Sequence, residues 1–206
     1  KKYRFIVSLC NYANETLISM YVSKIRLHNF RNYLDLRLDF CKNWNILIGE
    51  NGVGKTNILE AIYYGSTTRS PRTNNLTDLI NLQNKNDGFV VELEFLEDNT
   101  LQNQTIHHQY LRENNKSNKV IKLNQKNVPI MELLGKIPFV YFVPEGLNII
   151  KNDSKFRRKL IDFILFQIDP NYKFLASQYN KILKERNILL RDIRDKKTSA
   201  EYLEEW

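Results

Sequence analysis

The chain has 206 residues, of which 42% are hydrophobic and 26% are charged, and its formal net charge is +8. This composition is typical of a globular protein with one sizeable core, or of one domain with an appendage. No apolar run approaches a membrane span, and polar residues interrupt the short apolar stretch near the N-terminus, which argues against a secretory signal. The positive charge is compatible with a polyanionic partner and equally with a solvated, lysine-rich surface.

Two cysteines, Cys10 and Cys41, have neither metal nor redox spacing, and they predict no disulfide framework. We therefore expect a reducing compartment and a cytoplasmic protein. A strand pattern begins just after Met20, so residues 1–19 are expected to lie outside the fold, as a leader or an upstream extension.

The residues from Met20 onward predict a series of β-strands. Residues 21–27 form the first, and in residues 34–40 leucines alternate with charged side chains, so one face of that strand is expected to be buried. Residues 89–96 alternate in the same way, and asparagine-rich turns separate three shorter candidates, at 104–111, 119–123 and 139–143. This order predicts an antiparallel meander beside another sheet.

A glycine-rich motif interrupts the strands. It matches the pattern G-x-x-x-x-G-K-[ST] and reads Gly49, Glu50, Asn51, Gly52, Val53, Gly54, Lys55, Thr56. The apolar run 44–48 before it predicts a buried strand, and the apolar residues of 58–63 after it repeat at helical spacing. Strand, glycine loop and helix in this order are the context that a phosphate-binding loop requires.

The residue types of this loop predict its chemistry. Glycines let the backbone bend so that successive N–H groups face phosphate oxygens, and the start of the helix adds its positive end. Lys55 would neutralise the β- and γ-phosphates, and the Thr56 hydroxyl would hold Mg²⁺. The sequence thus predicts a site for a nucleoside triphosphate and Mg²⁺. The alternative is a glycine turn that enters a helix without a ligand.

From Ser154 the pattern becomes helical. Asp169-Pro170 breaks it, and the next helix has an apolar face with coiled-coil-like spacing. The other face of that helix carries four cations, Lys181, Lys184, Arg191 and Arg194. They are candidates for binding a polyanion, or they form a solvated helix face.

Several separated segments carry a family resemblance: NFRNY at 29–33, the loop and helix at 49–62, STTRSPRT at 66–73, VPEGL at 143–147, RRKLID at 157–162, DPNY at 169–172 and KERN at 184–187. In order and spacing they resemble the RecF family of bacterial recombination mediators, which are relatives of the SMC-type DNA-repair ATPases. A phosphate-binding loop alone is shared by many NTPases, whereas this combination is far more specific.

The resemblance implies an α/β fold, an ABC-type ATPase head lobe with a mixed sheet and an antiparallel β meander, followed by a helical arm. Residues 20–150 would form the N-terminal part of the head, and residues 151–206 the start of a truncated arm. The implied function is DNA replication and repair. Such a protein binds ATP, Mg²⁺ and single-stranded or gapped DNA without sequence preference, helps mediator proteins to load recombinase, and is an ATP-dependent homodimer at full length.

Residue by residue, the resemblance assigns Gly49–Thr56 to the nucleotide and its Mg²⁺. Arg31 and Asn32 fall where related heads approach the nucleotide from the first hairpin, and the alternative for Arg31 is a surface arginine. Arg69 and Arg72 would face phosphate or DNA, or would be solvated turn residues.

For Arg157 and Arg158 the resemblance favours a structural or interface role near the arm. Glu145 or its neighbour falls where relatives place a metal- and water-sensing loop, although they usually have a carboxamide there, and an exposed turn residue after Pro144 is an equal alternative. The family's signature loop and its late acidic strand end have no counterpart before Trp206. We therefore assign no catalytic residue and expect no ATP hydrolysis by this chain alone.

Two other functions compete with this one. A small P-loop NTPase or kinase unrelated to DNA would need an arginine-rich lid, whereas residues 70–140 predict β structure. A non-catalytic module would have a vestigial loop and basic helices that serve a partner protein. The intact Lys55 and Thr56 argue against that second alternative.

Overall fold

The structure of the chain is a computed structural model that describes residues 20–42, 44–83, 88–97, 102–113, 116–133, 137, 139–142 and 154–199. The chain divides into two compact units, Lys1–Asn148 and Ile149–Trp206, and each is described by itself. The predicted extension at 1–19 and the segment that contains Glu145 lie outside the described residues.

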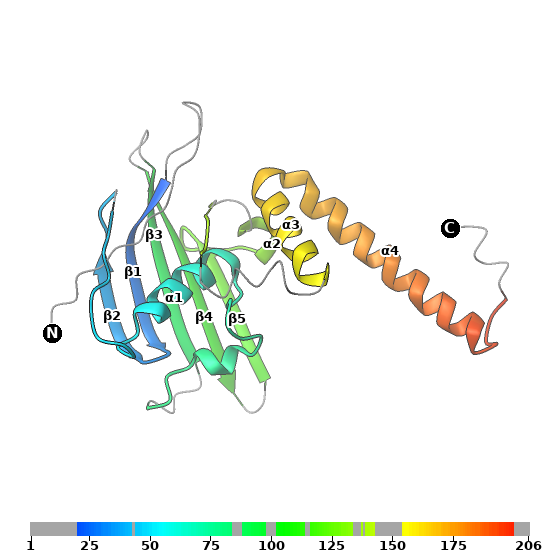
Figure 1. Cartoon of the computed structure of the whole chain (residues 1–206), viewed down its shortest axis with the longest axis horizontal. Helices are drawn as coiled ribbons and strands as arrows, with labels where there is room; N and C mark the ends of the chain where they lie inside the picture. The colour runs from blue at the N-terminus through cyan, green and yellow to red at the C-terminus, as the bar shows by residue number, and fades with distance from the viewer. Residues whose placement is uncertain are drawn as a thin grey trace. The chain divides into compact units, whose positions relative to one another are not determined.

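The first unit contains a six-stranded sheet in the order β2-β1-β3-β4-β5-β6 (Figure 1). Its strands are β1 (Met20–Phe30), β2 (Tyr33–Asp39), β3 (Gly88–Glu97), β4 (Asn103–Glu113), β5 (Lys116–Leu123) and β6 (Lys126–Asn127). Every neighbouring pair is antiparallel. The predicted meander is therefore confirmed, and the alternation that predicted β3 is visible as burial of Phe89, Val91, Leu93 and Phe95 on one face.

Helix α1 (Lys55–Thr67) packs against the buried face of this sheet, as Figure 1 shows. Ile58 and Ala61 are fully buried there. The approach is close, because a Cβ added to Gly65 would lie 2.3 Å from a methyl carbon of Leu93 on β3. Two short helical turns, η1 (Leu76–Leu79) and α2 (Ile130–Leu133), complete the described elements of this unit. The helix predicted after the glycine loop is confirmed.

The apolar segments 44–48 and 139–143 do not form the predicted strands in the described structure. Trp44, Ile46 and Ile48 are 71%, 51% and 62% exposed, and residues 46 and 48 form only isolated bridges. Residues 139–142 are irregular, with Phe142 72% exposed. The prediction of a buried strand before the loop is therefore wrong for this chain. An apolar run predicts that a segment can be buried, and only a covering element buries it; among the described residues of 44–48, only Leu47 packs against the core.

Strand β2 also departs from its predicted burial. Leu34 is 49% exposed, whereas Leu36 and Leu38 are partly buried against the core. The reason is position, because β2 is an edge strand that, among the described strands, pairs with β1 alone. An edge strand buries less of its apolar face than the alternation of its residues predicts.

A buried histidine lies between α1 and the sheet. His108 on β4 is fully buried, and its Nε2 donates a hydrogen bond to the Gly65 carbonyl at 2.7 Å. Burial lowers the pKa of His108 from 6.5 to about 4, and the hydrogen bond to Gly65 opposes this shift. The side chain is therefore neutral in the folded protein at neutral pH.

This histidine predicts acid sensitivity of the first unit. Below pH 6.5 His108 binds a proton in the unfolded chain but stays neutral in the folded protein. The free energy of unfolding therefore falls as the pH drops from 6.5 towards 4, by roughly 3 kcal/mol in total. Above pH 6.5 this contribution is constant. Urea unfolding at several pH values checks it, with His108→Gln as the comparison because an amide can still donate to Gly65. Equal pH slopes for the two proteins between pH 4 and 6.5 would contradict the assignment.

The second unit consists of α3 (Ser154–Ile168) and α4 (Pro170–Arg194). The predicted break between them is confirmed: Asp169 caps α4 by accepting a hydrogen bond from the Asn171 N–H at 2.8 Å, and Pro170 occupies the first turn, where its missing N–H costs nothing. The Tyr172 hydroxyl donates to the Asp162 carboxylate at 2.6 Å and ties the two helices together.

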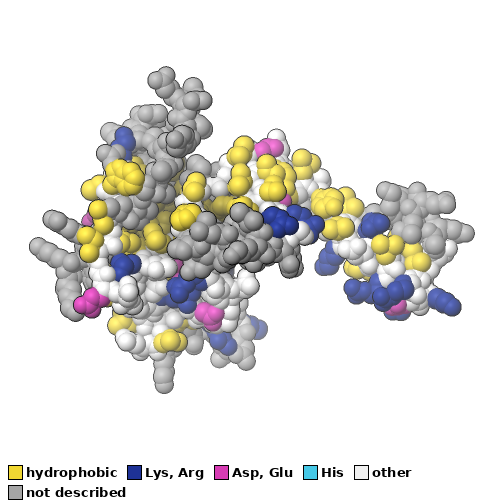
Figure 2. Space-filling view, viewed as in Figure 1, with side chains coloured by type: hydrophobic (Ala, Val, Ile, Leu, Met, Phe, Trp, Pro, Cys, Tyr) yellow, Lys and Arg dark blue, Asp and Glu magenta, His cyan; other side chains and the backbone are white. Residues whose placement is uncertain are grey.

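Both faces of α4 are largely exposed in this unit. Its apolar side includes Phe174 and Tyr179, which are 63% and 65% exposed. The predicted basic residues of the other side are also exposed, and Figure 2 shows lysine and arginine side chains gathered over the C-terminal part of α4. Among the described helices none is long and apolar enough to cross a membrane.

Candidate nucleotide-binding site

The glycine loop has the backbone that its motif predicts. Gly52 and Gly54 have φ angles of +85° and +106°, which residues other than glycine rarely adopt. Gly54 is also the N-cap residue of α1. A Cβ added there would lie 2.6 Å from the Tyr33 hydroxyl oxygen and 2.5 Å from the Asn32 amide nitrogen. The positive φ angle of residue 54 and the close approach of its backbone to the β1–β2 turn therefore both require glycine at this position.

Lys55 and Thr56 begin α1 immediately after this turn. The Lys55 ammonium donates hydrogen bonds to the carbonyls of Gly49 and Glu50, at 2.7 and 2.8 Å, and so lies across the loop. Thr56 is exposed, and the first turn of α1 contains no acidic residue. Free N–H groups at a helix start, a lysine and no nearby helix carboxylate are suited to a phosphate group. The Thr56 hydroxyl is available to Mg²⁺.

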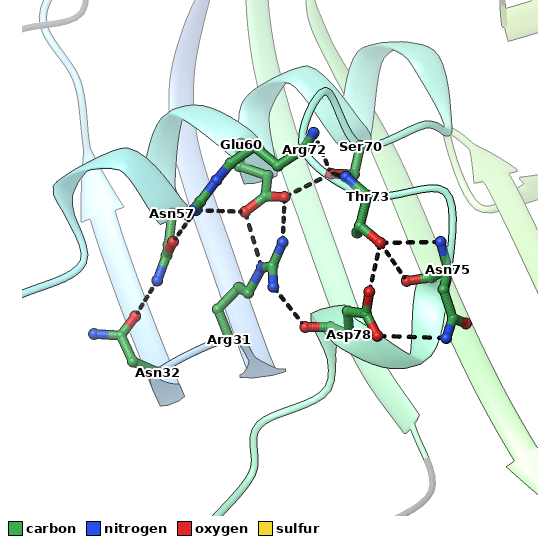
Figure 3. A network of polar contacts seen from close by, with 9 residues as sticks. All are labelled: Arg31, Asn32, Asn57, Glu60, Ser70, Arg72, Thr73, Asn75 and Asp78. Carbon is green, nitrogen blue, oxygen red and sulfur yellow. Dashed lines mark hydrogen bonds and ion pairs between the residues drawn. The ribbon is translucent and has the colours of Figure 1, made fainter. Parts of the chain in front are cut away.

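Behind the loop, a buried carboxylate organises a polar network (Figure 3). Glu60 on α1 is fully buried. Arg31 donates to it through Nε at 2.9 Å and through a terminal nitrogen at 2.6 Å, while the Ser70 hydroxyl donates at 2.6 Å. A terminal nitrogen of Arg72 lies 3.4 Å from the same carboxylate. Two arginines and a hydroxyl thus satisfy a charge that burial alone would disfavour.

The same network extends to the segment around η1. Arg31 also donates to the Asp78 carbonyl at 2.7 Å, and its backbone N–H donates to the Leu79 carbonyl at 2.6 Å. Thr73 and Asn75 hydrogen-bond to the Asp78 side chain, as Figure 3 shows. The β1–β2 turn, α1 and residues 70–79 are therefore joined around one carboxylate.

A chain of amides connects this network to the glycine loop. Arg72 donates to Asn57 Oδ1 at 2.9 Å, Asn57 Nδ2 donates to Asn32 Oδ1 at 2.8 Å, and Asn32 Nδ2 donates to the Val53 carbonyl at 2.9 Å. Figure 3 shows that Arg72, Asn57 and Asn32 follow one another in this order. The β1–β2 turn therefore contacts the loop directly.

The structure brings most of the predicted site residues together. Asn32 touches the loop, whereas the Arg31 guanidinium is engaged with Glu60 beneath it. Arg72 belongs to the same network. Arg69 is exposed and lies outside this network. Burial is the main cause that lowers the pKa of Lys119, and the positive charge of Arg69 lowers it further. Arg157 and Arg158 are exposed on α3, in the other unit.

Sequence reasoning assigned no role to Glu60 or Asn57. A signal for Glu60 was present, because this carboxylate directly precedes Ala61 and Ile62 on the apolar side of α1. A charged residue in a buried helical position requires a partner. The identity of that partner was not readable, since Arg31 lies 29 residues earlier in the chain.

Fold and site together define a P-loop nucleotide-binding head lobe followed by helices. The chain belongs to the family described as AAA domain, whose model matches residues 24–206.

Curated relatives narrow the comparison to RecF. The chain is 39% identical over 190 residues to the DNA replication and repair protein RecF of Acetivibrio thermocellus, covering 91% of this chain and 49% of the relative. It is 41% identical over 174 residues to RecF of Clostridium beijerinckii, covering 84% and 45%. A solved structure described as the recombination mediator protein RecF-ATP in the RecFOR pathway matches with a TM-score of 0.75 and 34% identity, over 91% of this chain and 49% of that one.

The predicted resemblance to RecF and the predicted fold class are therefore confirmed. The chain spans about half the length of the relatives that it matches.

Proposed function

We propose that this chain is the ATP-binding segment of a RecF-type DNA replication and repair protein. The observation that supports it most is the loop, in which two positive-φ glycines lead into α1 and Lys55 lies across the turn. The relatives bear the name DNA replication and repair protein, and one similar structure is described with ATP.

In this proposal Gly49–Thr56 hold the phosphates through backbone N–H groups and the Lys55 ammonium. Thr56 supplies a hydroxyl ligand to Mg²⁺, which neutralises phosphate charge. Asn32 flanks the loop and Arg31 supports it through Glu60. The chain's own residues bind and orient the triphosphate. The proposal also includes a cytoplasmic location and, for the full-length protein, an ATP-dependent homodimer. It further includes cooperation with mediator proteins and recombinase.

Calorimetric titration with Mg-ATP tests this function. We expect saturable binding that weakens when Mg²⁺ is removed, because the metal and the loop share the phosphate charge. No heat of binding at millimolar ATP would contradict the proposal. An ATPase rate that depends on Lys55 in the purified 206-residue chain would favour the alternative, a small NTPase or kinase.

We further propose that the basic side of α4 binds single-stranded or gapped DNA without reading its sequence. The candidate contacts are exposed lysines and arginines on one helix, and such contacts go to phosphates. Binding should therefore weaken steeply as salt increases. Replacing Lys181, Lys184, Arg191 and Arg194 by Glu is expected to lower the affinity at least tenfold and to reduce the log–log salt slope by about 3, at roughly 0.7 per phosphate contact.

Fluorescence anisotropy with a labelled oligonucleotide measures both quantities. The matched control reverses four cations of the sheet unit, Arg37, Lys116, Lys122 and Lys126, and so changes the net charge equally. We expect this control to keep its salt slope within about one unit. If the two variants behave alike, net charge explains the binding and the α4 face is a solvated helix surface.

A further inference from the structure

The connection between Asn57 and the loop extends the proposed ATP-binding function and rests on it. We propose that Asn57 is a positioning residue for the phosphate-binding loop, which acts by holding Asn32 in the orientation that lets Asn32 donate to the Val53 carbonyl. Asn57 itself needs no contact with the nucleotide. Its hydrogen bonds to Arg72 and Asn32 measure 2.9 and 2.8 Å.

The direction of this chain of hydrogen bonds is set at its charged end. A guanidinium can only donate, so Asn57 must turn its oxygen towards Arg72. Its amide nitrogen then faces Asn32, which must accept with its own oxygen. The nitrogen of Asn32 is left to face the loop, where it meets a carbonyl oxygen at 2.9 Å. The guanidinium at one end and the Val53 carbonyl at the other therefore fix the orientation of both amides.

Arg72 is itself held in place from the protein interior. Its terminal nitrogen lies 3.4 Å from the fully buried carboxylate of Glu60, and its backbone N–H donates to the Ser70 hydroxyl at 3.0 Å. Ser70 in turn donates to Glu60. We call the hydrogen-bonded chain Arg72–Asn57–Asn32 the relay. Its donor end, Arg72, is therefore anchored to Glu60 on α1 both directly and through Ser70.

The target of the relay explains its effect on phosphate binding. The chain has no cis peptide bond among its described residues, and in a planar trans peptide the C=O and N–H groups point in opposite directions. Holding the Val53 carbonyl against Asn32 on the β1–β2 turn therefore directs the Gly54 N–H away from that turn. Gly54, at φ +106°, lacks the side chain that would otherwise resist rotation of this peptide unit. Without the relay the peptide can turn over and present an oxygen to phosphate.

Two replacements of Asn57 test the proposal. Asp is equal in size and still accepts from Arg72, but it cannot donate to Asn32; Leu is similar in size and does neither. We expect both to weaken Mg-ATP binding at least tenfold by calorimetry. The Leu variant excludes an effect of added negative charge. Asn124→Asp is the matched control, because Asn124 lies in the β5–β6 turn of the same unit, accepts from the Thr105 N–H through an oxygen that Asp retains, and is outside the Glu60 network.

A double-mutant cycle separates positioning from general damage. If Asn57 acts through Asn32, then Asn57→Leu should have little further effect on ATP affinity in an Asn32→Ala background. Additive losses would overturn the proposal. Unchanged affinity in both Asn57 variants, while Lys55→Ala abolishes binding, would overturn it too and leave the ATP-binding function intact.

A readout without nucleotide keeps the two proposals distinguishable. In the nucleotide-free protein, the backbone amide resonance of Gly54 should shift in Asn57→Asp and Asn57→Leu and should stay in place in Asn124→Asp. A Gly54 resonance that does not move in the Asn57 variants contradicts the relay whether or not the wild-type chain binds ATP. If the resonance moves and wild type binds no ATP, the positioning role stands and the ATP-binding function fails.

Discussion

Replacing Lys55 by Ala is expected to abolish measurable binding of Mg-ATP, a loss of at least a hundredfold or roughly 3 kcal/mol. The Lys55 ammonium is held over the loop by the carbonyls of Gly49 and Glu50, at 2.7 and 2.8 Å, and in the proposed function it neutralises phosphate charge from this position. Charge-assisted hydrogen bonds are the strong ones, and alanine removes every one that this side chain can make.

Calorimetry on wild type and variant measures this effect. Lys126→Ala is a suitable control, because Lys126 is an exposed lysine on β6 and its removal changes the net charge by the same amount. Alanine at position 55 also deletes the two loop contacts, so the thermal midpoint of the nucleotide-free variant should be recorded alongside. Equal ATP affinity in the wild type and Lys55→Ala would show that the loop is not the nucleotide site.

Replacing Glu60 by Ala should destabilise the sheet unit by about 3 kcal/mol or more, because removing one partner of a buried ion pair leaves the other uncompensated. Glu60 is fully buried, and the Arg31 side chain is only 19% exposed. Arg72 is half exposed and can turn to water, so Arg31 dominates the cost. Glu60→Gln keeps the shape and one acceptor oxygen and should cost less.

Hydrogen exchange of core amides on β3 is the suitable measurement, since the strand belongs to the sheet unit and reports its opening without contribution from α4. The double variant Arg31→Ala with Glu60→Ala should cost clearly less than the sum of the two single variants, because neither then leaves a buried charge alone. A loss below about 1 kcal/mol for Glu60→Ala would mean that the carboxylate contributes little to the fold.

Local patterns were sufficient for the secondary structure around the site. Alternation predicted β3, helical spacing predicted α1, and Asp169-Pro170 marked the start of α4, because each signal depends on residues close together in the chain. The loop is equally local: glycines at 52 and 54 and the lysine that follows set its backbone through their own φ preferences and the start of the helix.

Burial and pairing were decided by tertiary structure. The apolar run 44–48 predicted a buried strand, yet Trp44 is 71% exposed, because hydrophobic character cannot specify which element covers it. In the sequence Glu60 is one residue of a predicted helix. Its role depends on Arg31 and Arg72, which reach it from the β1–β2 turn and from the segment after α1. The amino-acid sequence thus predicted the loop and its likeness to RecF, and that likeness implied a place near the nucleotide for Asn32. Only the fold could assign Asn57 and Glu60 to the support of the loop, since side chains distant in sequence meet only once the chain has folded.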